Sequence, residues 1–324
     1  MPEAPAGSAR PNLPPRPGSR AARTRAVPAP SARRRARPSP AQAGVLRRRR
    51  LWLASGATAV VVVAIAALLA TYGTSSSSDK GSTKPAQGTF AVSAPVLQPL
   101  AAVPAQALLA AARAHPTAAA APTPLPAGAP ALTLGGKPEV LYIGANYCPY
   151  CAAQRWPLFM ALSRFGTFTG LQGTTSSSTD VNPSTPTLTF YRAQYHSAYL
   201  AFVAVETHGN IALPSGAYPV LSTPTQAQAA LLAKWDAPPY VPAGAAGGIP
   251  FVDLGGRSVF VGSQYDASAL AGLNFDRAVS QLAAGQTTTA RAARAAAGYL
   301  VRDLCRLTGD RPAGTCAGAT GFGP

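Results

Sequence analysis

The hydrophobic pattern of this 324-residue chain is clearest near its middle, where a β-prone run leads into a helical pattern. Val140 to Ile143 are consecutive apolar or aromatic residues, and residues 144–145 form a small-residue turn after them. From Cys148 to about Arg164, large apolar residues recur at helical spacing. The pattern predicts a buried strand that runs directly into a helix.

Strand and helix patterns alternate through the rest of the C-terminal part. Helices are predicted at Ala105–Ala112, Thr225–Lys234, Ala267–Ala283 and Thr289–Leu307, and strands at Phe168–Leu171, Thr187–Tyr191 and Tyr199–Val205. Ile249–Leu254 and Arg257–Val261 flank two glycines and predict a β-hairpin. Thr174–Thr179 is a polar run that predicts a loop. This alternation is typical of the α/β class.

The N-terminal quarter has a different pattern. Residues 1–50 are mostly Ala, Pro, Arg and Ser without any aromatic residue, which predicts disorder. Leu51–Tyr72 is an uncharged run of 22 residues. As a helix it spans roughly 33 Å, against a hydrocarbon core of about 30 Å, so it predicts one transmembrane helix.

Arginines at positions 47–50 abut the start of this run, and the positive-inside rule then places the N-terminus in the cytoplasm. The alternative is a cleaved signal peptide, although its apolar region is usually shorter. Either reading exports the rest of the chain. We therefore expect a single-pass cell-membrane protein whose C-terminal domain lies outside the cytoplasm.

The composition beyond the predicted span suggests three further parts. Residues 73–89 read as a flexible Ser/Thr/Gly linker, and 90–131 as a short helix with an Ala/Pro-rich extension. A folded domain with an insertion is expected over 132–318.

Net charge changes the picture little. The formal charge is +17, but 13 of the 28 Lys and Arg lie at or before Arg50. The rest of the chain carries 15 basic against 10 acidic residues. We expect the basic segment to set topology and predict no specific nucleic-acid partner, with contact to acidic lipid or nucleic acid as the alternative.

The candidate chemistry lies in Cys148-Pro149-Tyr150-Cys151, at the start of the predicted helix. Unpaired N–H groups and the positive dipole end favour thiolate at the first position, so Cys148 is the candidate nucleophile. Cys151 lies one turn later on the same face and is placed to resolve a mixed disulfide. A structural CxxC disulfide is the alternative.

The other cysteines and the histidines complete the inventory. Zinc would need a second ligand pair at close spacing, which the sequence lacks, so no metal and no cofactor are expected. Cys305 and Cys316 predict a structural disulfide that ties the tail to the last helix. A relay pair that exchanges with Cys148 and Cys151 is the alternative. Asp180 and Glu206 are possible proton-transfer groups that the sequence alone does not place.

These residues resemble a known family. A strand ending Ala145-Asn146-Tyr147, a CPYC at a helix start and a downstream Gly248-Ile249-Pro250 before a hairpin are similar to the thioredoxin superfamily. GANYCPYCAAQRW, LSRFGTF, SSSTDV and the two late cysteines more closely resemble the prokaryotic family called domain of unknown function 929. The resemblance covers roughly residues 90–316.

The resemblance implies a thioredoxin-like mixed sheet flanked by helices. It makes Cys148 the attacking and Cys151 the resolving cysteine, and Pro250 a cis-proline that faces the substrate. Ile249, Tyr147 and Tyr150 are the expected substrate-binding neighbours. Thioredoxins carry a buried Asp six residues before the first cysteine, and this chain has Tyr142 there. Proton handling by that route is therefore not expected to transfer.

Two functions follow as hypotheses. The first is a membrane-anchored thiol-disulfide oxidoreductase that exchanges disulfides with exported proteins and is served by a membrane redox partner. The second is a non-catalytic binding or scaffold module at the cell surface in which the CPYC disulfide stays inert. A reversible two-thiol transition would distinguish them.

Overall fold

A mixed β-sheet forms the centre of the described part of the chain. The computed structural model describes residues 87–115 and 117–319. The sheet order is β2-β11-β10-β4-β3, and β9 also pairs with β4. The six strands are β2 (Thr123–Pro124), β3 (Thr133–Leu134), β4 (Lys137–Gly144), β9 (Ala201–Glu206), β10 (Phe251–Leu254) and β11 (Ser258–Val261).

Strand β4 is the predicted apolar strand, and its neighbours run in both directions. It is parallel to β9 and antiparallel to β10, with Ile143 opposite Phe251. Val140 and Tyr142 face one core cluster, whereas Leu141 and Ile143 face the other. Successive side chains of a strand point to opposite faces of the sheet. Consecutive apolar residues in β4 therefore indicate that both faces of the sheet are covered at this strand.

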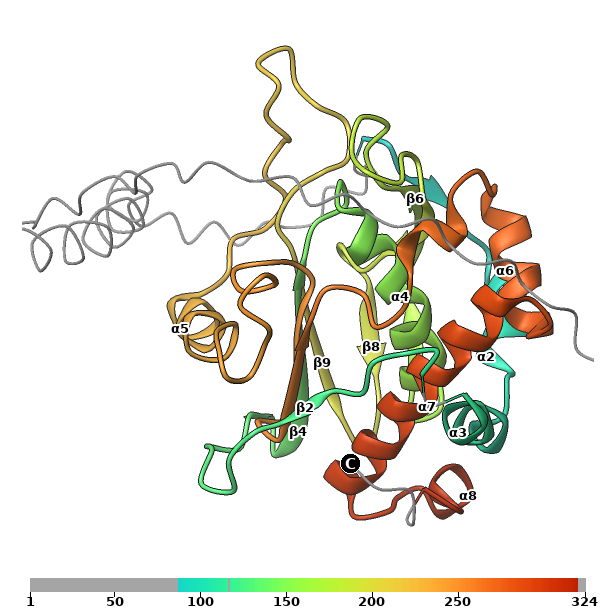
Figure 1. Ribbon diagram of the computed structural model, residues 1–324, viewed down its shortest axis with the longest axis vertical. Coiled ribbons are helices and arrows are strands. Elements are labelled where there is room, and N and C mark those ends of the chain that lie inside the picture. The colour runs from blue at the N-terminus through green and yellow to red at the C-terminus, as the bar shows by residue number, and fades with distance from the viewer. Residues whose placement is uncertain (1–86, 116, 320–324) are drawn as a thin grey trace, which may run out of the picture. The chain divides into compact units, whose positions relative to one another are not determined.

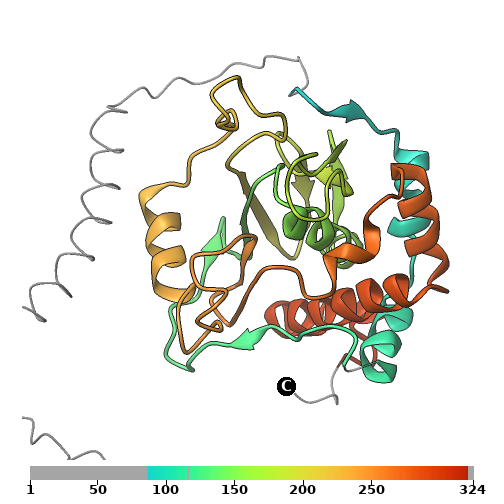
Figure 2. The same cartoon turned by 45° about the horizontal axis from the view of Figure 1, so that its top comes forward.

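Helices cover the two faces unequally (Figures 1 and 2). One face packs against the larger core, to which α2 (Ala94–Ala101), α3 (Ala105–Ala114), α4 (Pro149–Leu162), α6 (Phe275–Ala284) and α7 (Thr288–Thr308) contribute. The other face carries α5 (Gln226–Trp235), whose Trp235 packs beside Leu141 and Ile143. Thr225 begins α5 with a reciprocal capping box to Gln228.

Smaller elements complete the unit. A three-stranded sheet contains β1 (Phe90–Ala91), β6 (Gln172–Thr175) and β7 (Pro186–Thr189), and a two-stranded sheet contains β5 (Thr167–Thr169) and β8 (Gln194–His196). The 3₁₀ helix η1 (Ala267–Leu270) precedes α6, and α8 (Ala313–Cys316) follows α7. The predicted single helix over 267–283 is thus η1, a break, and α6.

The folded unit begins earlier than the sequence predicted. We expected its start near Leu132, but α2 and α3 belong to the same core, with Leu100, Leu108 and Leu109 fully buried. Gly298 of α7 makes this packing possible, because a Cβ there would lie 2.1 Å from the carbonyl oxygen of Leu108. An alanine-rich sequence is a weak indicator of burial, so the sequence did not predict that α3 is internal. Its packing against α7 shows that it is.

The predicted Ser/Thr loop is also more ordered than expected. Thr174 lies in β6, and Ser176 and Ser177 are buried. The Thr185 N–H donates to the Ser176 hydroxyl at 2.9 Å, and the Ser177 N–H donates to the Tyr147 carbonyl at 2.8 Å. Local hydroxyl hydrogen bonds therefore allow a polar segment to pack against the residues before Cys148.

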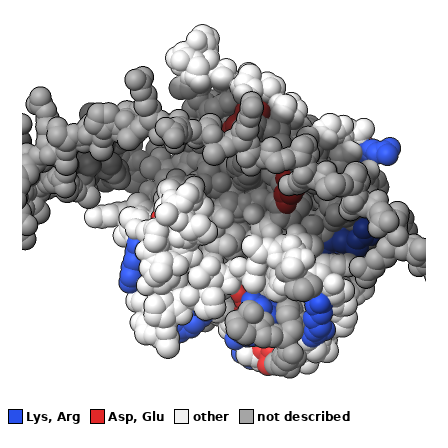
Figure 3. Space-filling view, in the orientation of Figure 1, with Lys and Arg blue, Asp and Glu red and all other residues white. Residues whose placement is uncertain are grey.

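The predictions for residues 1–50 and 51–72, and for nearly all of the 73–89 linker, concern residues outside the described part. Within 87–115 and 117–319, no single helix is long and apolar enough to span a membrane, and only α2 with α3, bent by 53°, pass that test as a pair. On the face of the described residues seen in Figure 3, charged side chains are scattered among uncharged ones.

Candidate dithiol site

Cys148 is the N-cap of α4 and Cys151 lies in its first turn. The backbone N–H of Cys151 donates to Cys148 Sγ at 3.2 Å. Both cysteines are free thiols and both are buried, with Cys148 4% and Cys151 0% exposed. Pro149 occupies N1, where the missing N–H leaves no helical hydrogen bond unmade. The helix start thus gives Cys148 a backbone donor.

The two thiols have opposite acidities. The pKa of Cys148 is lowered, chiefly by the hydrogen bond from the Cys151 thiol, although burial opposes this shift. The Cys151 backbone N–H and the charge of Arg155 lower it further. Burial raises the pKa of Cys151 well above its ordinary value. Cys148 is therefore the more nucleophilic sulfur and Cys151 holds its proton.

A buried ion pair lies directly beneath this pair. Arg155 is one helical turn after Cys151 and therefore on the same face of α4. Its Nη2 lies 2.7 Å from Glu206 Oε2, its Nε donates to Glu206 Oε1 at 2.9 Å, and both side chains are fully buried. Burial is the largest influence and would lower the pKa of Arg155. Glu206, Tyr142 and Cys151 together outweigh it, so the pKa lies above its ordinary value.

Arg155 also fixes the backbone before the cysteines. Its Nη2 donates to the Ala145 carbonyl at 2.8 Å and lies 3.3 Å from Asn146 Oδ1. Glu206, at the end of β9, accepts the N–H of Phe190 at 3.1 Å. The ion pair joins α4, β9 and the segment after β4. It therefore positions the cysteines, and its arginine also places a positive charge near their sulfurs. The sequence raised Glu206 only as a possible proton-transfer group and missed Arg155.

Pro250 lies across from the cysteines in the chain segment before β10. The Ile249–Pro250 peptide bond is cis, and the Ile249 carbonyl oxygen is 3.6 Å from Cys148 Sγ. Ile249 packs with Ala145, Cys148 and Cys151 in one small apolar cluster. Residues about 100 positions apart therefore meet at one sulfur.

The model of the family called domain of unknown function 929 matches residues 127–299, more than half of the chain. The chain belongs to this family. No curated protein and no solved structure matches it.

The region shared with the family contains the dithiol, Arg155, Glu206 and Pro250, whereas α2, α3 and the last two cysteines lie outside it. Nothing in the family description states an activity. The chemistry of the site must therefore be argued from its geometry.

Two tyrosines border the dithiol. Tyr147 stacks on Tyr218 with ring centroids 4.5 Å apart, and the Tyr218 hydroxyl donates to Ser177 Oγ at 2.6 Å. These contacts join the β6–β7 and β9–α5 connections at the end where α4 begins (Figure 1). Tyr150 differs, since it is 46% exposed. Of the predicted substrate neighbours, Tyr147 and Ile249 contact the cysteine cluster and Tyr150 faces solvent.

Exposed apolar side chains occur in the same two connections. Val181 lies between β6 and β7, and Ile211, Leu213 and Val220 lie between β9 and α5. Asp180, the other possible proton-transfer group, neighbours Val181 and is not brought to the sulfurs by any hydrogen bond among the described residues. These two connections therefore carry four exposed apolar side chains.

Tyr142 lies near the end of β4, six residues before Cys148. A Cβ on Gly144 would lie 2.3 Å from the Tyr142 hydroxyl. Only glycine therefore fits at position 144 with the Tyr142 side chain in this place. The hydroxyl is buried without a hydrogen-bond partner among the described residues, and burial raises its pKa well above the ordinary value. It can donate a proton to hydrogen bonds at neutral pH but does not act as a base.

Cys305 and Cys316 form a disulfide with sulfurs 2.00 Å apart, joining α7 to α8. The Thr315 hydroxyl donates to the carbonyl of Arg164, just beyond the C-terminal end of α4. Cys148 caps the other end of this 14-residue helix, roughly 20 Å away. This distance supports a structural bond over a relay. No group of three His, Cys, Asp or Glu lies together within the described ranges.

Proposed function

We propose that this protein is a membrane-anchored thiol-disulfide oxidoreductase with a thioredoxin-like domain that acts on exported proteins. The observation that carries the proposal is the unequal pair of free thiols at the start of α4, with an activated Cys148 and a protonated Cys151. A purely structural pair needs no such inequality. Perturbed acidities of this kind are typical of reactive sites.

The arrangement of elements supports the thioredoxin-like assignment. A strand leads through the CPYC into a helix, a parallel strand lies on one side, and an antiparallel hairpin preceded by a cis-proline lies on the other. Helices cover both faces of this sheet. In this reading α2, α3 and the small sheets are additions to the basic fold.

The exchange reaction follows from the two thiols. The Cys148 thiolate attacks one sulfur of a client disulfide, forms a mixed disulfide and releases the other client sulfur as a thiolate, which takes up a proton. Cys151 then loses its proton and attacks Cys148 Sγ, which frees the second client thiol. The client gains two electrons and two protons, and the pair becomes a disulfide. The reverse sequence oxidises a client dithiol.

The surroundings of the site support each step. Arg155 lies one turn below Cys151, so its positive charge favours the thiolate form of Cys148 in the first attack and of Cys151 in the second. The cis-Pro250 segment and the Ile249 carbonyl border Cys148, where a client backbone would lie. Tyr150, the exposed residue between the two cysteines, offers an aromatic contact for a client segment.

The location is argued from the sequence alone. The uncharged run Leu51–Tyr72 with arginines before it supports an N-in, C-out anchor, and the Cys305–Cys316 disulfide is consistent with an oxidising compartment. A membrane redox partner would then restore the dithiol after each cycle.

The test is a trapping experiment with the full chain in cells. Replacing the resolving thiol (Cys151→Ser) should accumulate reducible covalent complexes with client proteins on a non-reducing gel. The matched variant Cys148→Ser should accumulate none. Complexes that depend on Cys151 instead would reverse the assignment of the nucleophile. No complexes from any variant would favour the scaffold hypothesis.

A separate experiment tests the location. A compartment-dependent reporter fused after Pro324 should be active only outside the cytoplasm. Activity inside would overturn the topology but would leave the thiol chemistry of Cys148 open to the trapping test.

A further inference from the structure

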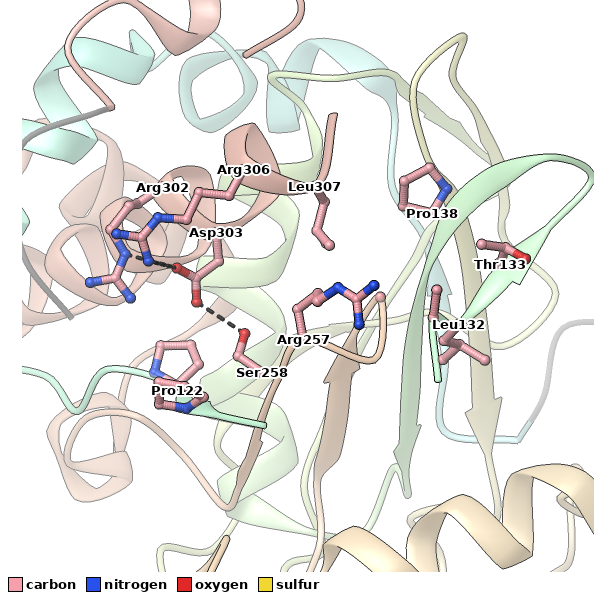
Figure 4. Close-up of a pocket in the computed structure, with 13 residues that line it drawn as sticks. Pro122, Leu132, Thr133, Pro138, Arg257, Ser258, Arg302, Asp303, Arg306 and Leu307 are labelled. Carbon is pink, nitrogen blue, oxygen red and sulfur yellow. Dashed lines mark hydrogen bonds and ion pairs between the residues drawn. The ribbon is translucent and has the colours of Figure 1, made fainter. Parts of the chain in front are cut away.

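A cavity lies away from the dithiol and is lined by three arginines. Its volume is about 420 Å³, within the roughly 300–1,000 Å³ range of ligand pockets. It lies between the segment from Pro122 to Pro138, the β10–β11 turn and the last two turns of α7 (Figure 4). None of the residues that line it belongs to the dithiol site.

The charges in this cavity are unbalanced. Arg257, Arg302 and Arg306 line it together with a single acid, Asp303. Asp303 is already engaged, since Arg302 Nε donates to its Oδ1 at 2.8 Å and the Ser258 hydroxyl donates to its Oδ2 at 3.1 Å. Arg302 and Asp303 are both buried and neutralise each other. Two positive charges, on Arg257 and Arg306, remain.

These two guanidinium groups have donors to spare. Arg257 Nη1 donates to the Ala129 carbonyl at 2.8 Å and to the Gly256 carbonyl at 3.4 Å. Arg306 approaches Asp303 only at 3.6 Å and its side chain is 53% exposed. The Nε and Nη2 groups of both arginines have no partner among the described residues.

The rest of the wall is apolar. Leu132 and Pro138 lie across the cavity from Asp303, Leu307 follows Asp303 by one turn on α7, and Pro122 lies on the lower edge (Figure 4). The C-terminal end of a helix carries a partial negative charge that favours a basic residue, which explains the presence of Arg306 without a ligand. It does not account for Arg257, which comes from a hairpin turn and lines the same cavity as Arg306 only in the folded protein.

We propose that this cavity binds a phosphate monoester carried on an apolar body. Guanidinium groups bind phosphate through two parallel hydrogen bonds, and a phosphate monoester carries about two negative charges at neutral pH. That charge matches the two arginines that remain. The apolar wall takes the attached hydrocarbon. A soluble phosphate ester and a lipid headgroup share this chemistry.

The test is calorimetric titration of the full chain in a mild non-ionic detergent. Phenyl phosphate should bind saturably, and inorganic phosphate should bind at least about tenfold more weakly because it lacks the apolar body. Arg306→Gln and Arg257→Gln should each weaken phenyl phosphate binding by about tenfold or more. Arg277→Gln, which removes an exposed arginine on α6 outside the cavity, should leave binding unchanged.

A second titration distinguishes the two sources of ligand. Phosphatidic acid in mixed micelles should bind far more tightly than phenyl phosphate, with the same arginine dependence, if the natural ligand is a lipid headgroup. Equal or weaker binding assigns the site to a soluble ester. Absence of arginine-dependent binding in both titrations overturns the proposal. Equal binding of inorganic and phenyl phosphate overturns the role of the apolar wall.

Discussion

The two cysteine pairs of this protein lie at opposite ends of α4 and differ in bonding and surroundings, although all four residues are buried. Cys148 and Cys151 are free thiols at the helix start, beside a buried ion pair. Cys305 and Cys316 are bonded to each other beyond the helix end and hold α8 to α7. The comparison indicates that the location of a thiol, more than its residue type, decides whether it reacts or braces the fold.

Within residues 87–115 and 117–319, buried polar atoms without a partner are more numerous around the dithiol, although Nε of Arg164 is one such atom at the disulfide end of α4. The hydroxyl of Tyr142, Nδ2 of Asn146, Nη1 of Arg155 and Nδ1 of His208 are buried without partners among the described residues, and all surround the strand–helix junction before Cys148. Such groups cost free energy unless water or a ligand satisfies them. Departures from polar satisfaction gather at functional sites.

The largest expected effect is loss of redox chemistry at the dithiol end. In a titration with defined glutathione potentials, alkylation should report a reversible two-thiol transition in the native protein. Cys148→Ser should abolish it completely. Cys305→Ser with Cys316→Ser should retain it. Loss of the transition in the double variant would mean that the two pairs exchange electrons.

Arg155→Met should lower the free energy of unfolding by about 3–5 kcal/mol, because it leaves the buried carboxylate of Glu206 unpaired. It should also raise the pKa of Cys148, since Arg155 favours the thiolate. Urea denaturation and thiolate absorbance measure the two effects. Arg155→Lys keeps the charge if the Met variant does not fold.

The matched control for Arg155 is Arg302→Met, which breaks the buried pair with Asp303 on α7. It should destabilise the protein without changing the pKa of Cys148. A shift of that pKa in the control would show that any loss of stability, and not the charge of Arg155, sets the reactivity of the dithiol.

Removing the disulfide should cost less. Closing the loop between Cys305 and Cys316, which are 11 positions apart, contributes about 3 kcal/mol by chain entropy. For a domain of this size, Cys305→Ser with Cys316→Ser should lower the melting temperature by roughly 6–12 °C in calorimetry. An unchanged melting temperature would contradict a structural role.

The pH dependence of alkylation should separate the two thiols of the CPYC. Thiolate is the reactive form, and a lowered pKa means that Cys148 remains thiolate as the pH falls below the ordinary titration range of cysteine. In Cys151→Ser, the iodoacetamide rate should therefore fall only at pH values below that range. The hydrogen bond from the Cys151 thiol is the largest cause of the shift, and the hydroxyl introduced by Cys151→Ser can still donate one.

The smallest effect is expected at Tyr142. Tyr142→Phe removes a buried hydroxyl that lacks a partner among the described residues and should raise the free energy of unfolding by about 1 kcal/mol. Urea denaturation measures this change. A loss of stability would mean that an ordered water satisfies the hydroxyl in the native protein.

Local sequence was sufficient for much of the fold. The four apolar residues Val140–Ile143 predicted β4, the CPYC predicted the start of α4, and two glycines predicted the β10–β11 hairpin. These signals are local, since side-chain periodicity, caps and turn residues act within a few positions along the chain. The family followed from the same motifs, and its match to residues 127–299 confirms it.

Only the tertiary structure decided which distant residues meet. Arg155 looks like a solvent-facing helix residue until β9 brings Glu206 to it, and α3 looks peripheral until Gly298 of α7 receives it. The same is true of Arg257 and Arg306, which share a cavity although 49 positions separate them. Charge pairing and close packing depend on distances between elements, and those distances are set by how the sheet and helices pack rather than by neighbours in sequence.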